Sequence, residues 1–298
     1  MGNRALLLRS KRLWLWSATV GAGVMLCAFA PRLAETGGVL GSFGRLIPAA
    51  ALLPFVGALV CEYVDSSLGM GYGTLLTPLL LLLGFRAHQV VPCVLLSELV
   101  TGASAAFLHH QDGNVDFVRD PAARSTALLL TALSAAGAVV GGLVAVNLPA
   151  AWLNIAMAVI VLGAGSFVLL AVRRKLPYHR GHMIGLGLLA AFNKSLSGGG
   201  YGPLVTAGQV VCGVSAKQAV AVTSLAESVV CLVGLLTYLG LRGTVDWGLA
   251  LVLTTGAVLS VPMATLTVRA LPEARMKTAV GLLTVGLGIA ALFRFVSI

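Results

Sequence analysis

The sequence NKSLSGGGYGP at residues 193–203 interrupts a long apolar region with polar residues and glycines. A related sequence, VDSSLGMGYGT, lies at residues 64–74, and an offset of 129 residues aligns the two without a gap (201 − 72 = 129). The match continues beyond these segments, and 14 of the 35 positions from Ser66 to Val100 are identical to their counterparts. Random pairing would give about two or three identities. The chain therefore contains an internal duplication.

The composition of the 298 residues indicates a polytopic membrane protein. Hydrophobic residues make up 58% of the chain and charged residues only 10%, and the mean hydropathy is +0.97. Soluble domains contain about 25% charged residues. The net charge of +10 is typical of basic cytoplasmic loops in such a protein, and we expect no nucleic-acid partner.

Seven segments have roughly the 20 apolar residues that a spanning helix needs, namely 13–30, 88–110, 125–147, 150–172, 215–239, 248–270 and 277–296. Shorter apolar pieces flank the glycine-rich segments, at 46–62 and 74–85 and at 183–193 and 203–213. An 11-residue helix is about 17 Å long and reaches only the middle of a bilayer. Each pair of pieces therefore predicts a re-entrant helical hairpin, which membranes tolerate when it is buried in protein.

The predicted fold is an all-α polytopic membrane protein with two repeats, each a re-entrant hairpin plus three spans. Residues 1–45 form an N-terminal span and an external linker, 46–172 the first repeat, 173–182 a basic cytoplasmic linker and 183–298 the second repeat. Since three spans are an odd number, the second repeat is inverted. Inverted repeats with broken helices at the centre are typical of secondary transporters.

The N-terminus is predicted to be cytoplasmic. Residues 1–30 resemble a signal peptide, with four basic residues before an apolar run, but Pro31, Trp14 and Trp16 favour an uncleaved first span. With this orientation, 14 Lys and Arg residues lie inside and five outside. The positive-inside rule favours this topology.

The two hairpin tips form the predicted binding site for a small oxyanion. The half-helix after each tip begins near Thr74 or Pro203, and its free N–H groups and positive dipole end point at the tip. Glycines let an anion approach the backbone, and hydroxyls add donors. The predicted binding residues are Ser66, Gly71, Tyr72, Gly73, Lys194, Ser195, Ser197, Gly198, Gly199, Gly200 and Tyr201. The competing interpretation is a tight turn in which these hydroxyls satisfy local backbone groups.

Lys194 aligns with Asp65, so the internal symmetry predicts that the two lie close together. Either they form a salt bridge that joins the tips, or Lys194 faces the anion; the two roles are compatible. Glu98 and Glu227 are also symmetry mates. They are expected mainly to accept hairpin N–H groups, with proton coupling as the alternative.

Other functions fit the sequence less well. Gly-Tyr-Gly occurs twice, but a potassium filter needs four like-oriented carbonyl loops, so a cation channel is the second candidate and an intramembrane enzyme the remote third. His109, His110 and Asp112 could bind a metal, although a span end at the interface explains them better. The five cysteines lack CxxC spacing and predict packing residues. We expect no cofactor and no metal.

The duplicated glycine-rich segment, the following Gly-Phe or Gly-Val with its glutamine, and residues 193–202 resemble the TauE/SafE sulfite exporter family. The resemblance covers roughly residues 46–296, and Met70 departs from it by replacing a glycine. It implies an inner-membrane carrier that exports sulfite, organosulfonates or related small anions. The partners are then a small anion and the lipid bilayer, and homo-oligomerisation stays open. The membrane potential would drive this export without ATP.

Overall fold

The computed structural model describes residues 49–147, 180–197, 200–242, 244–272 and parts of 274–286. The predicted N-terminal span, the predicted span 150–172 and the linker at 173–179 lie outside the described residues, as do Gly198 and Gly199. Every regular element of the described part is a helix. The helices are α3 (Ala49–Leu68), α4 (Tyr72–Leu82), α5 (Ala87–Gln111), α6 (Pro121–Asn147), α8 (Arg180–Ser197), α9 (Tyr201–Val211), α10 (Ala216–Arg242) and α11 (Trp247–Ala270).

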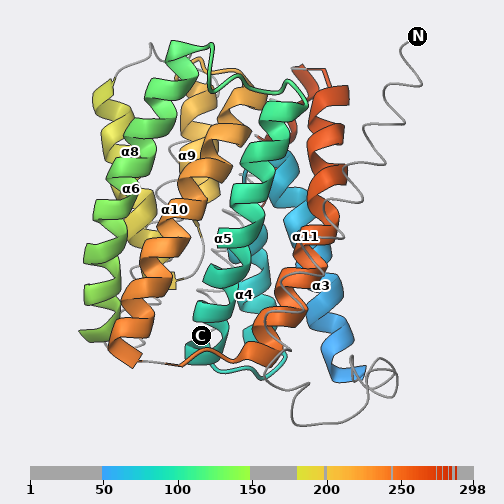
Figure 1. The fold of residues 1–298 in the computed structure, drawn as a ribbon, viewed down its shortest axis with the longest axis vertical. Helices are drawn as coiled ribbons and strands as arrows, with labels where there is room; N and C mark the ends of the chain where they lie inside the picture. The colour runs from blue at the N-terminus through green and yellow to red at the C-terminus, as the bar shows by residue number, and fades with distance from the viewer. Residues whose placement is uncertain are drawn as a thin grey trace.

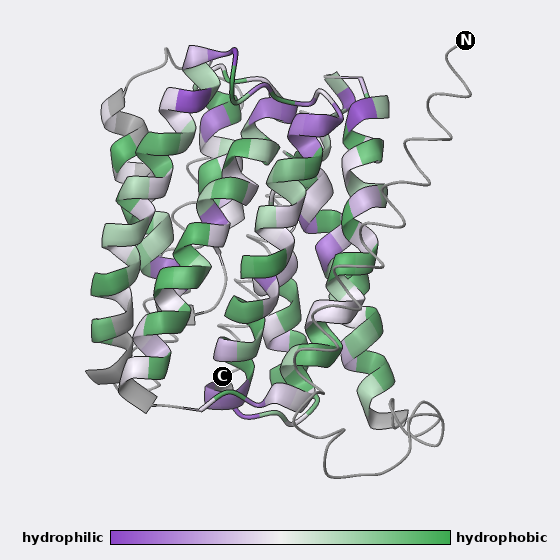
Figure 2. Cartoon of the chain, in the orientation of Figure 1, coloured by the Kyte–Doolittle hydropathy of each residue, from purple (hydrophilic) through white to green (hydrophobic). Residues whose placement is uncertain are grey.

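Five of these helices, α3, α5, α6, α10 and α11, are long and apolar enough to cross a membrane. The predictions 88–110, 125–147, 215–239 and 248–270 are therefore confirmed as helices, with ends that differ by a few residues. Figure 2 shows apolar residues along the length of the bundle and polar residues gathered at its two ends. This distribution fits a bundle that is embedded in a bilayer.

The breaks in the two hairpins are shorter than the sequence predicts. Helices α3 and α8 continue to Leu68 and Ser197, so only three residues separate each from the next helix. The polar residues stay helical because they find local partners; Ser66, for example, donates to the carboxylate of Glu62 one turn earlier at 2.6 Å. With 20 and 18 residues, α3 and α8 are about 30 and 27 Å long. The expectation that residues 183–193 form a half-length helix is therefore wrong for α8, whereas α4 and α9 have the predicted half length.

Glycines with positive φ follow α3 and precede α4 and α9. Gly69 and Gly71 have φ of 70° and 140°, and Gly200 has φ of 81°. These values are unfavourable for residues with a Cβ. The glycine-rich tips are thus the points at which the backbone must turn.

The duplication is visible in the helix boundaries. Helices α4 and α9 both have 11 residues and begin and end 129 positions apart, and α5 and α10 also begin 129 positions apart. The turns that follow α4 and α9 contain Gly84 and Gly213, with φ of 92° and 89°. The two halves of the chain therefore share one local structure.

The helices of the two halves make equivalent packing contacts. Helix α3 packs on α11 and α8 packs on α6, so in the described part of the chain each hairpin contacts the long helix that follows the central helix of the other half. Helices α5 and α10 pack on each other at the centre (Figure 1). The α5–α6 connection lies at the top of Figure 1, and the corresponding α10–α11 connection lies at the bottom.

Small residues bring these helices close together. A Cβ at Gly137 would lie 2.8 Å from the Leu188 carbonyl of α8, and one at Gly141 would lie 2.6 Å from the Phe192 carbonyl. On the other side of the bundle, Gly256 of α11 faces the Phe55 carbonyl of α3. Gly137, Gly141 and Gly256 thus allow the close approach of helices that is typical of membrane bundles.

Candidate functional site

Lys194 lies at the centre of a buried ion-pair cluster. Its ammonium group is 2.5 Å from Glu98 Oε2 of α5 and 2.8 Å from Glu227 Oε1 of α10. The lysine is 0% exposed, and both glutamates are buried as well. The carboxylate partners of Lys194 are thus Glu98 and Glu227, not the predicted Asp65, because these two glutamates project toward it from the central helices.

Glu98 also holds the first hairpin tip. Its second oxygen, Oε1, accepts the backbone N–H of Gly73 in the first turn of α4 at 3.0 Å. Glu98 thus accepts a hairpin N–H group. One carboxylate therefore links the N-terminus of α4 to the lysine of α8.

Asp65 is bound within its own hairpin. Its Oδ1 accepts the backbone N–H of Tyr72, the first residue of α4, at 3.2 Å. Together, Asp65 and Glu98 place two carboxylates at the positive end of α4, where the dipole favours negative charge. The N-terminus of α4 is therefore already occupied by acidic groups of the protein itself.

The two tips touch each other. The N–H of Gly200, the residue before α9, donates to the hydroxyl of Thr74 in α4 at 3.0 Å. In the other direction, the Thr206 hydroxyl of α9 donates to the Gly69 carbonyl at 2.7 Å and contacts the Thr223 hydroxyl at 2.8 Å. A Cβ at Gly202 would collide with the backbone of Gly69 and Met70. The two tips are therefore in direct contact.

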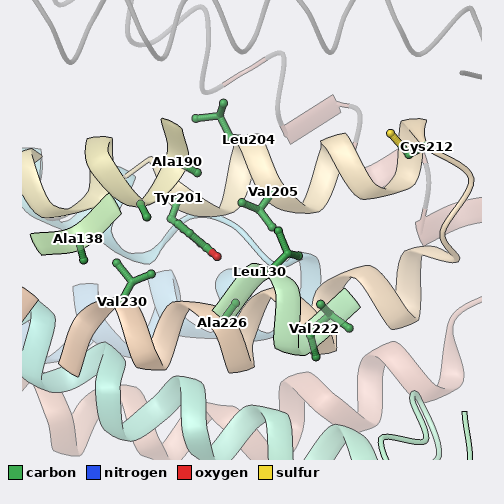
Figure 3. Close-up of a cluster of buried hydrophobic side chains, with 12 residues drawn as sticks. Leu130, Ala138, Ala190, Tyr201, Leu204, Val205, Cys212, Val222, Ala226 and Val230 are labelled. Carbon is green, nitrogen blue, oxygen red and sulfur yellow. The ribbon is translucent and has the colours of Figure 1, made fainter. Parts of the chain in front are cut away.

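The two tyrosines of the Gly-Tyr-Gly motifs are fully buried, and their hydroxyls are engaged by serines. Tyr72 is 2.7 Å from Ser97 of α5, and Tyr201 is 2.6 Å from Ser134 of α6. Figure 3 shows Tyr201 among apolar residues that include Leu130, Ala226 and Val230. Both tyrosines therefore have a partner in the protein, and the sequence did not predict their serine partners.

Two serine hydroxyls near the tips are buried without a hydrogen-bond partner in the described part of the chain, those of Ser67 and Ser195. Ser195, one of the predicted donors, follows Lys194 directly and is 7% exposed. By contrast, the hydroxyl of Ser66 is bound to Glu62. Of the remaining predicted residues, Gly71 immediately precedes α4, Gly73 lies in its first turn, and Ser197 ends α8.

Glu62 is a buried carboxylate that the sequence analysis missed. Its two oxygens accept the hydroxyls of Ser66 at 2.6 Å and Thr101 at 2.9 Å. The available signal was an acidic residue at the end of an apolar helix; the alignment hid it, because position 191 in the second repeat is alanine. The membrane core thus contains one more acid than the sequence analysis considered.

His109 joins the first hairpin to α5 and α11. Its Nε2 lies 2.9 Å from the Ser66 carbonyl, and Nδ1 lies 3.0 Å from the amide of Asn114, which also donates to the Thr265 carbonyl. Among the described residues, no group of three His, Cys, Asp or Glu has the arrangement of a metal site. Cys61, Cys93, Cys212 and Cys231 are buried free thiols, as predicted.

A helical membrane bundle with two broken helices, whose tips meet beside a buried ion pair, defines a membrane transporter. Residues 53–291 match the family model described as "Sulfite exporter TauE/SafE", and the chain belongs to this family. It is also 30% identical over 223 residues to the "Probable membrane transporter protein YtnM" of Bacillus subtilis (strain 168), covering 70% of this chain and 71% of that protein. A comparison with solved structures finds no match.

Proposed function

We propose that the protein is a secondary transporter that exports a small anion, such as sulfite or an organosulfonate, across the inner membrane. The observation that carries this proposal is the opposite charge at equivalent positions of the two tips. Asp65 supplies an acidic cap to α4 at 3.2 Å, whereas the residue 129 positions later is Lys194, a cation that cannot accept an N–H.

The anion would bind at the N-terminus of α9. The backbone N–H of Gly200 is donated to the neutral hydroxyl of Thr74, not to a carboxylate. The partial positive charge of this helix end and the nearby lysine both attract an anion. Ser195, a buried hydroxyl without a described partner, adds a donor on the same turn as Lys194.

The residues proposed for binding are the second-tip members of the predicted set: Lys194, Ser195, Ser197, Gly198, Gly199, Gly200 and Tyr201. The first-tip members would support this site from the opposite side: Asp65, Ser66, Gly71, Tyr72 and Gly73. The tight contact between the tips favours this division, because the backbones of Gly69 and Gly202 are too close to admit an anion between them.

We also propose that the two repeats are inverted, with both hairpins entering the membrane from opposite sides. Two observations support this arrangement. The two halves make equivalent helix-packing contacts, and the α5–α6 and α10–α11 connections lie at opposite ends of the bundle. Single cysteines at Val118 and Thr244, which are both exposed, provide the test. Position 118 should react only from the cytoplasm and position 244 only from outside; labelling from one common side would contradict the inversion.

The test of anion transport is a flux screen with the purified protein in proteoliposomes. Sulfite, sulfate, thiosulfate, methanesulfonate and simple carboxylates are offered one at a time. A transporter gives saturable flux and counterflow, because the loaded site must change its side to release the anion. Non-saturable conduction without counterflow indicates a channel, and the absence of flux for every anion contradicts the proposal.

A further inference from the structure

The buried cluster around Lys194 contains more negative than positive groups. Asp65, Glu98 and Glu227 lie around this one lysine, Glu62 lies beside these carboxylates, and each of the four acidic residues is at most 7% exposed. Two of them touch the ammonium group directly. An anion that approached Lys194 would therefore face two carboxylates at close range, and buried like charges repel strongly.

We propose that Glu227 takes up one proton each time an anion binds to Lys194, so that the protein moves one proton together with each anion. This inference rests on the proposed anion transport and adds its coupling ion. The geometry that carries it is the 2.8 Å contact between Glu227 Oε1 and Lys194. Neutralising this carboxylate frees one direction of the ammonium group for the substrate.

Glu227 fits this role better than Glu98 because it has fewer ties to the tips. Glu98 accepts the Gly73 N–H at 3.0 Å, contacts Lys194 with its other oxygen and lies 3.7 Å from the Cys231 thiol. Losing its charge would loosen the first tip as well as the lysine. In the described part of the chain, Glu227 forms its hydrogen bond and ion pair with Lys194, and its charge also faces Asp65.

The other titratable groups that face the cluster are held by contacts of their own. Glu62 of α3 is bound by two hydroxyls, and Asp65 by the Tyr72 N–H. Tyr72 of α4 and Tyr201 of α9 are paired with serines. Cys61 of α3 and Cys231 of α10 are buried free thiols, and the imidazole of His109 of α5 contacts the Ser66 carbonyl.

The transport step balances in charge and protons. On the loading side, a proton from solution adds to the Glu227 carboxylate and the Lys194–Glu227 ion pair is replaced by a Lys194–anion pair. The site keeps its net charge when the anion is a monoanion and gains one negative charge when it is a dianion. On the release side, the anion leaves, Glu227 returns its proton to solution and the original ion pair forms again. A monoanion then crosses without net charge, so the membrane potential would not drive its export as the sequence analysis expects, whereas a dianion crosses with one negative charge and would still be driven.

The proton-to-anion ratio of the wild-type protein tests the inference. Methanesulfonate and thiosulfate are loaded into proteoliposomes because neither binds a proton near neutral pH, and an internal pH dye reports proton movement. We expect one proton per anion, methanesulfonate flux that does not respond to a valinomycin-set potential, and thiosulfate flux that does. Anion flux without proton movement overturns the inference, whereas no flux of these anions or of sulfite contradicts the proposed function instead.

The Glu227→Gln variant locates the proton. It should abolish proton movement and remove the pH dependence of the remaining flux, since the amide cannot titrate. Glu62→Gln is the matched control, because Glu62 is equally buried but contacts hydroxyls and not Lys194; it should keep one proton per anion. Proton coupling that survives in Glu227→Gln, or disappears in Glu62→Gln, assigns the proton to another group and overturns the assignment.

Discussion

The two hairpins lead into equivalent half-helices but carry opposite charge at equivalent positions. Both lead into an 11-residue half-helix that begins with Tyr-Gly, and both contain glycines with positive φ. Before the first tip, Asp65 of α3 caps the half-helix that follows, and before the second tip Lys194 of α8 occupies the equivalent position. Equivalent half-helices would therefore fix where the proposed site lies, while a single pair of unlike residues, Asp65 and Lys194, would decide which charge it accepts.

The two equivalent glutamates also differ in what they contact. Glu98 and Glu227 occupy equivalent positions on α5 and α10, yet both are directed at the same lysine. Because only the second hairpin supplies a cation, Glu98 and Glu227 cannot both form an ion pair within their own repeat, and their roles must differ. Glu98 also holds the first tip through Gly73, which leaves Glu227 for exchange with the substrate.

Replacing Lys194 should have the largest effect on anion flux and on stability. In Lys194→Met, Glu98 and Glu227 face each other without a cation, and removing one partner of a buried ion pair costs about 3–5 kcal/mol of stability. We expect anion flux to fall to background and thermal unfolding in detergent to move to lower temperature. Lys217→Met is the control, since Lys217 lies at the edge of the bundle, bound to the Arg269 carbonyl. Near-normal flux in Lys194→Met would mean that the second tip does not need its positive charge.

Replacing the glycine that precedes α9 should have the next largest effect. Val at Gly200, where φ is 81°, introduces strain of about 1–3 kcal/mol and places bulk where an anion would approach the backbone. Gly213→Val is a matched control, because its φ is 89° and no atom lies within 4 Å of an added Cβ.

Both variants should lose comparable stability, but only Gly200→Val should lose anion flux beyond the loss expected from reduced folding. Flux per correctly inserted molecule, compared at equal protein density, separates the two effects. Equal losses of flux in both variants would show that strain alone matters and that the α9 N-terminus does not bind the anion.

Much of this architecture could be predicted because it depends on local pattern. The offset of 129 residues predicted the equivalent half-helices, and four spans followed from apolar length alone. The ends of α3 and α8 were predicted wrongly. Asp65, Ser66 and Ser195 are polar residues after an apolar run, and such a pattern is typical of the end of a buried helix. Their burial depends on tertiary partners, such as Glu62 for Ser66, that no local pattern contains.

The sequence predicted which residues belong to the candidate site better than it predicted which of them contact each other. Lys194, Glu98 and Glu227 were identified as charges inside the membrane, but alignment paired Lys194 with Asp65, since symmetry relates positions and does not specify contacts. The serine partners of the tyrosines could not be found by symmetry either. Ser97 and Ser134 lie on different helices, and their counterparts in the other repeat, at positions 226 and 263, are alanine and methionine.

The smallest expected effect comes from the threonines that occupy equivalent positions in the two half-helices. The Thr206 hydroxyl donates to the Gly69 carbonyl of the first tip and contacts Thr223, whereas the hydroxyl of its counterpart Thr77 is buried without a partner in the described residues. Thr206→Val should therefore cost about 1–3 kcal/mol by leaving a buried carbonyl unsatisfied. Thr77→Val removes an unpaired hydroxyl at almost constant volume and should be neutral or slightly stabilising.

Thermal unfolding of the two threonine variants in the same detergent measures this difference. For a chain of this size, a loss of about 1 kcal/mol lowers the midpoint by roughly 2–4 °C. Thr206→Val should unfold several degrees below Thr77→Val, because only the second half-helix uses its threonine to hold the opposite tip. Equal midpoints would mean that the contact between Thr206 and Gly69 adds no stability, and that the tips are held together by the ion pairs of Lys194 and the packing of Gly202 against Met70.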